Sequence, residues 1–147
     1  MENDPAAQLA AISEARSTLA DRLVTPWWYH PVLGLAAAGF VVGYGFGNTV
    51  VRLASALAFI LVCLGLAHVY KRRAGVWVSG LDAGRAGRWA KATGALVGIT
   101  AITAWAIGSY TGLDWLIWCI AAFAFVAAVV VGRRFDAALR AQLRAGA

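Results

Sequence analysis

Four long apolar segments alternate with short charged segments along this chain. Each apolar segment has about 20 residues, which is the length that an α-helix needs to cross a ~30 Å hydrocarbon core. Backbone amides find no water in that core, so such segments are helical there. We therefore predict an all-α membrane protein with four transmembrane helices, arranged as two antiparallel hairpins. The predicted spans are residues 27–49, 50–70, 92–112 and 113–132.

The composition supports a membrane protein with one transmembrane domain. The 147 residues are 61% hydrophobic and 14% charged, whereas soluble domains average about 45–50% and 25%. We expect residues 26–132 to form this domain, with cytoplasmic segments at 1–25 and 133–147. The net charge of +6 is attributed to basic residues that flank the membrane helices, and we expect no direct nucleic-acid binding.

The basic residues predict the orientation in the membrane. Twelve of the thirteen Lys and Arg residues lie before residue 26, between residues 71 and 91, or after residue 132. Because cytoplasmic loops carry an excess of Lys and Arg, both termini and the 71–91 loop are predicted to be cytoplasmic. We expect the membrane to be the bacterial cytoplasmic (inner) membrane. The exception, Arg52, is predicted to form an ion pair with Asp114 at the outer ends of their helices.

Two cytoplasmic segments have an amphipathic pattern. Apolar residues recur at three- and four-residue steps before Pro26, and again after residue 132. Both helices would lie on anionic lipid, or pair with each other, a second copy or a soluble partner. Basic residues of the 71–91 loop are expected to contact lipid headgroups or an acidic partner protein. The predicted contact residues are Leu9, Ile12, Leu19, Leu23, Lys71, Arg72, Arg73, Arg85 and Arg88.

Three glycines recur every fourth residue in the first span. Gly39, Gly43 and Gly47 would share one helix face, where a second helix backbone could approach closely. That face would serve either packing within the four-helix bundle or a homodimer interface. A small four-span protein buries little surface alone, which favours a homo-oligomer.

The spans contain no Asp, Glu, Lys or Arg well inside them. Proton-coupled transporters need such a group along their path. Small multidrug exporters have four helices and a glutamate in the first span, but this first span has none.

Two histidines are expected at similar depth near the cytoplasmic interface. His30 begins the first span, and His68 ends the second. Neither has a Cys, Asp or Glu beside it, so we expect hydrogen bonds to carbonyls or lipid headgroups. Ligation of a metal or haem is the less favoured alternative, and we predict no cofactor and no metal site.

The string from Pro26 to Pro31, with Trp27, Trp28, Tyr29 and His30 between the prolines, is followed by Leu33-Gly34 and an Ala/Gly-rich span. It resembles small four-span membrane proteins of unknown function from high-GC, actinobacterial genomes. Some of these are encoded beside winged-helix transcription regulators. The resemblance transfers no catalytic residue, and it implies a membrane partner or regulator for a cytosolic protein.

These patterns predict a non-enzymatic membrane adaptor or regulatory subunit, acting on a cytosolic or membrane partner. The alternative is a dimeric small-molecule transporter or channel subunit, which would use the Gly39, Gly43 and Gly47 face. An enzyme is not expected, because Ser, His, Asp and Cys do not occur at nucleophile or ligand spacing.

Overall fold

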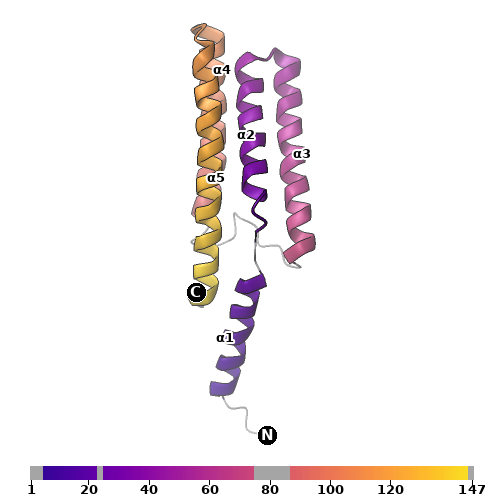
Figure 1. Cartoon of the computed structure of the whole chain (residues 1–147), viewed down its shortest axis with the longest axis vertical. Coiled ribbons are helices and arrows are strands. Elements are labelled where there is room, and N and C mark those ends of the chain that lie inside the picture. The colour runs from indigo at the N-terminus through magenta and orange to yellow at the C-terminus, as the bar shows by residue number, and fades with distance from the viewer. Residues whose placement is uncertain (1–4, 23–24, 75–86, 146–147) are drawn as a thin grey trace.

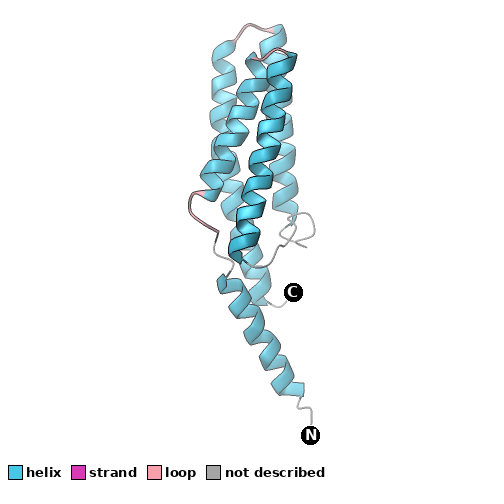
Figure 2. Ribbon diagram, turned by 90° about the vertical axis from the view of Figure 1, so that its right-hand side faces the viewer, coloured by secondary structure: helices cyan, strands magenta, loops and turns pink. Residues whose placement is uncertain are grey.

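The computed structural model describes residues 5–22, 25–74 and 87–145, which form five helices and no strand. They are α1 (Pro5–Arg22), α2 (Tyr29–Phe46), α3 (Thr49–Ala74), α4 (Gly87–Tyr110) and α5 (Asp114–Ala145). Figures 1 and 2 show α2 to α5 lying lengthwise beside one another, with α1 projecting beyond one end.

The all-α prediction and the four apolar helices are confirmed. Helices α2 to α5 are each long and apolar enough to cross a membrane. Their boundaries differ from the predicted spans mainly at the charged ends, where α3 continues to Ala74 and α4 already begins at Gly87. Basic residues such as Arg72 and Lys91 are good helix formers, so the helices extend past the apolar segments.

Short turns join α2 to α3 and α4 to α5. Asn48 precedes α3, and its side-chain Oδ1 accepts a hydrogen bond from the Val51 backbone N–H at 3.0 Å, a typical N-terminal cap. Between α4 and α5 the chain turns at Gly112, which has a φ of 65°. A side chain would strain that left-handed conformation, so glycine is favoured there.

The core lies between α2, α4 and α5. Its central residues are mainly small side chains, with Val41 from α2, Ala104 from α4 and Ile117, Ala121 and Ala124 from α5. Small side chains let helix backbones approach closely, which is how helices gain packing energy when lipid offers no hydrophobic driving force.

Helices α2 and α5 pack along an antiparallel seam. The buried face of α2 comprises His30, Gly34, Ala37, Val41 and Gly45, spaced three or four residues apart. From one end of α2 to the other, His30 meets Gly132, Gly34 meets Phe125 and Val129, and Gly45 meets Ile117. Steps of three and four residues on both helices are typical of the knobs-into-holes packing seen in helix bundles.

Helix α3 packs against α2 and lies outside this core. Phe59 of α3 stacks on Phe40 of α2, with ring centroids 5.2 Å apart. Only 6% of the most apolar stretch of α3 is buried, compared with 28% of the corresponding stretches of α2 and α5. The remaining face of α3 exposes Val50, Leu53, Leu57, Ile60, Leu61 and Leu64.

Helix α5 is one continuous helix of 32 residues. The sequence predicted a span ending at residue 132 and an amphipathic tail from 133, and the structure joins the two in one helix without a break. Residues 133–145 contain no proline or glycine, so nothing interrupts the helical hydrogen bonds. The extension lets α5 reach past the start of α2 and contact α1.

Candidate ligand-binding cavity at the basic end

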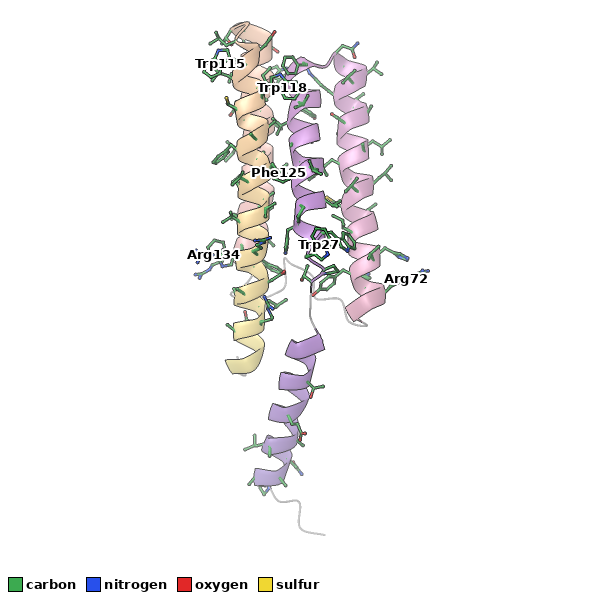
Figure 3. All side chains as sticks on the ribbon, in the orientation of Figure 1. Trp27, Arg72, Trp115, Trp118, Phe125 and Arg134 are labelled. Carbon is green, nitrogen blue, oxygen red and sulfur yellow. The ribbon has the colours of Figure 1, made fainter. Side chains whose placement is uncertain are left out.

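One end of the bundle gathers the basic side chains, and we call it the basic end. Helices α2 and α4 begin there, and α3 ends there. Figure 3 shows Trp27, Arg72 and Arg134 toward this end, with Trp115 and Trp118 near the other. The exposed basic residues of the described chain at this end are Lys71, Arg72, Arg88, Lys91, Arg133, Arg134 and Arg140.

A cavity of about 230 Å³ opens at the basic end between all four long helices. It is smaller than the ~300–1,000 Å³ typical of sites for drug-sized ligands, and its lining is mostly apolar. One wall is formed by residues of α2 together with Thr25, and the opposite wall by residues of α5. Helix α3 contributes a tyrosine, and α4 contributes an alanine and a threonine. The lining residues are Thr25, Tyr29, His30, Leu33, Tyr70, Ala90, Thr93, Gly132, Phe135, Asp136 and Leu139.

A histidine–aspartate pair joins α2 to α5 in this cavity. His30 Nε2 lies 2.7 Å from Asp136 Oδ2, and the two side chains are 8% and 16% exposed. Because both groups are largely shielded from water, their hydrogen bond contributes more to the stability of the folded protein than an exposed pair would.

Gly132 provides the space that the His30 ring occupies. A Cβ at position 132 would lie 2.8 Å from His30 Cε1 and closer still to Nδ1. Nδ1 is buried and has no hydrogen-bond partner in the described part of the chain. The ring is therefore fixed by packing on one side and by Asp136 on the other.

Aromatic rings surround the pair. Tyr29 meets His30 edge to face, with centroids 5.4 Å apart, and meets Tyr70 of α3 at 6.0 Å. The side chains of Thr25 and Tyr70 are hydrogen-bonded to each other. Asp136 is close enough to both tyrosine hydroxyls to interact with them electrostatically. The cavity thus combines one acidic group with several aromatic walls.

The sequence missed Asp136 as a partner of His30, so the expectation that no carboxylate lies near the histidines is wrong. The two residues are 106 positions apart, and the tail that carries Asp136 was expected to lie on the membrane surface or to pair with the N-terminal helix, a second copy or a partner. A signal existed: Phe135, Asp136 and Leu139 continue the helical spacing of α5 without a break. His68 does not join them and is exposed on α3.

No group of three or more His, Cys, Asp or Glu side chains in the described residues is placed to hold a metal ion. His30 and Asp136 supply two possible ligands, which are already hydrogen-bonded to each other.

The predicted glycine face is divided among different roles. Gly43 packs on Ser55 of α3, while Gly39 has no atom within 4 Å of where its Cβ would be. Gly47 lies beyond the end of α2 in an extended conformation, and its N–H caps the Gly43 carbonyl. The three residues therefore do not form one seam inside the chain, and the use of this face in a dimer stays a prediction.

Further close contacts between helices involve glycines outside the predicted face. A Cβ on Gly108 of α4 would collide with the carbonyl oxygen of Gly45 on α2, and a Cβ on Gly34 would lie 2.9 Å from Phe125. Gly45 lies six residues from Gly39 and two residues from both Gly43 and Gly47, so the four-residue spacing did not select it.

The predicted ion pair between Arg52 and Asp114 is not formed. Arg52 Nε instead donates to the Tyr44 carbonyl oxygen at 3.2 Å, and Asp114 is exposed in the first turn of α5. The reason is the arrangement of the helices: α3 packs on α2, away from the start of α5. Asp114 remains favourable where it is, because a carboxylate stabilises a helix N-terminus.

The predicted lipid or partner contacts are exposed wherever their side chains are described. Leu9 and Ile12 on α1 are 67% and 48% exposed. Lys71, Arg72 and Arg88 are exposed at the basic end, and Arg88 lies 5.7 Å from the Trp89 ring centroid. The side chains of Leu19 and Arg73, and the whole of Leu23 and Arg85, lie outside the described part of the structure.

Comparison with protein-family models, with curated proteins and with solved structures gave no match.

Proposed function

We propose that this chain is a four-span membrane protein that acts as a non-enzymatic adaptor or regulatory subunit, with both termini in the cytoplasm. The basic end is then the cytoplasmic end, where α1, the last turns of α5 and the basic side chains meet a soluble partner or anionic lipid. In a bacterium the host membrane is the cytoplasmic membrane. The resemblance to proteins encoded beside transcription regulators favours a cytosolic partner.

The observation that carries the proposal is the apolar core. In the described chain the buried polar side chains are His30 and Thr100. Thr100 Oγ1 donates to carbonyl oxygens of its own helix, those of Leu96 and Val97. A path for ions or polar solutes needs polar groups along its length. A core filled by alanine, valine and isoleucine supports a scaffold rather than a pore.

The projecting elements support the choice of a docking function. Among the described helices, α1 makes its main contacts with α5, and it exposes Leu9 and Ile12. An amphipathic helix beside basic residues suits a lipid surface or the groove of a partner protein. The transporter alternative needs a second copy, for which the open position at Gly39 and the outer face of α3 are available.

Deleting residues 1–24 is expected to abolish partner binding while membrane insertion continues. Insertion depends on the four apolar helices, none of which is touched by the deletion. The test is native mass spectrometry of the tagged chain extracted gently from its own membranes, with and without residues 1–24. A second polypeptide that co-purifies with the full chain and is lost from the truncated one supports the adaptor. A bare homodimer in both samples argues for the transporter instead.

Both termini are expected to face the cytoplasm. A fluorescent protein fused after Ala147 should then fold and fluoresce, whereas alkaline phosphatase at the same position should be inactive. Fusions after Gly112, in the turn between α4 and α5, should show the opposite pattern, because that turn lies at the other end of the bundle. Phosphatase activity at the C-terminus would contradict the proposed orientation.

A further inference from the structure

The side chains that line the cavity at the basic end determine which charge it favours. Neither a lysine nor an arginine belongs to the described residues that line it, although the surrounding surface is rich in both. Arg140 comes closest along α5, and its Nε donates to the backbone carbonyl of Asp136 from an exposed position. The charged side chain inside the lining is that of Asp136, beside His30.

Asp136 retains a free acceptor. His30 Nε2 contacts Oδ2, and the other carboxylate oxygen has no hydrogen bond to a described residue. The Asp136 side chain is 16% exposed and lines the cavity, so a ligand that carries positive charge or donates a hydrogen bond would be stabilised at this oxygen.

The aromatic lining favours the same ligands. Tyr29 and Tyr70 pack edge to face at an interplanar angle of 61° and both line the cavity, where Phe135 adds a third ring from α5. Aromatic faces attract cations, most strongly where water is excluded, and rings around an ammonium group are a recurrent solution for binding it.

We propose that this cavity binds a small organic cation, with Asp136 as its counter-ion and Tyr29, Tyr70 and Phe135 as its walls. The volume of about 230 Å³ suits a molecule with one ring or a compact alkylammonium group. This site is independent of the adaptor proposal: a regulatory subunit and a transporter could both contain it. The cation reaches it either as a soluble amine or as the amine headgroup of a lipid.

The test is calorimetric titration of the full chain in a non-ionic maltoside detergent with benzyltrimethylammonium. Its anionic counterpart, phenylmethanesulfonate, carries the same ring and serves as the comparison. We expect the cation to bind and the anion not to bind measurably. Equal affinity for the two probes, or no binding of the cation at millimolar concentration, would overturn the proposal.

Two sets of variants locate the bound cation. Asp136→Asn should weaken binding at least tenfold, whereas Asp114→Asn, at the far end of the same helix, should leave it unchanged. If Asp136→Asn does not fold, variants of Tyr29 provide the test. Tyr29→Leu should weaken binding at least threefold, whereas Tyr29→Phe should not weaken it, because phenylalanine retains the ring. Unchanged binding by folded Asp136→Asn, or equal affinities of the two Tyr29 variants, would show that the site is elsewhere.

Competition distinguishes the two sources of the cation. Displacement of the probe by lysophosphatidylethanolamine but not by lysophosphatidylglycerol identifies a lipid headgroup as the ligand. Displacement by neither lipid identifies a soluble amine. Equal displacement by both would mean that the acyl chain occupies the cavity, and would contradict selection for a cation.

Discussion

Replacing Gly132 with leucine is expected to lower the free energy of unfolding by about 3 kcal/mol, the upper end of the usual cost of overpacking. The new side chain would begin where the His30 ring lies. That ring cannot move aside easily, because Asp136 holds Nε2 at 2.7 Å and Tyr29 packs on it edge to face. Helices α2 and α5 would have to separate along the seam that builds the core. Unfolding in mixed micelles of dodecyl sulfate and maltoside, followed by tryptophan fluorescence, measures the change.

Gly39→Leu is the matched control, since the same substitution is made in a long apolar helix. Nothing lies within 4 Å of a Cβ at position 39, so the leucine meets open space. Leucine also forms helices more readily than glycine, by up to about 1 kcal/mol. We expect Gly39→Leu to be as stable as the wild type or slightly more stable. If the two variants differ by less than about 1 kcal/mol, the α2–α5 seam is not the main contact of this bundle.

The contrast between Gly39 and Gly132 also shows what the sequence could predict. Apolar length alone identified four helices, because an α-helix has a fixed rise and each apolar segment is long enough for a membrane. A four-residue glycine spacing identified a face, but not the helix that packs on it. Gly43 of that face meets Ser55 of α3, but close contacts are also made by Gly34, Gly45, Gly108 and Gly132, whose partners lie on other helices far along the chain. Such pairings depend on register between helices, which a single sequence does not specify.

The cavity was unpredictable for a related reason. Its polar pair combines His30, from an apolar segment, with Asp136, from a segment expected to lie on the membrane surface. Only the continuity of α5 past residue 132 places the two together. Equally, the ion pair predicted from charge alone, between Arg52 and Asp114, fails because α3 packs on the far side of α2. Local sequence patterns predicted the helices. Which polar groups come into contact depends on which helices pack against each other, and the local patterns do not specify that.

Breaking the pair between His30 and Asp136 is expected to cost about 1–3 kcal/mol in each single variant, because the remaining polar group loses its partner in a largely buried position. His30→Leu leaves a carboxylate facing apolar and aromatic side chains, and Asp136→Leu leaves the buried imidazole unpaired on both nitrogens. The double variant should be less destabilised than the sum of the two singles by about 1–3 kcal/mol, since both polar groups are then gone. The same micelle unfolding assay gives all three values.

Asp114→Leu provides the reference for removing an acid from α5 where no side-chain partner is lost. Asp114 is exposed in the first turn, where its favourable interaction with the helix dipole is worth at most about 1 kcal/mol. A double-variant cycle of His30→Leu with Asp114→Leu should therefore be additive, since the two residues lie at opposite ends of the bundle. Additivity in the His30–Asp136 cycle as well would mean that the two side chains do not interact in the folded protein. The cavity would then lose its fixed carboxylate, and with it the basis for binding a cation.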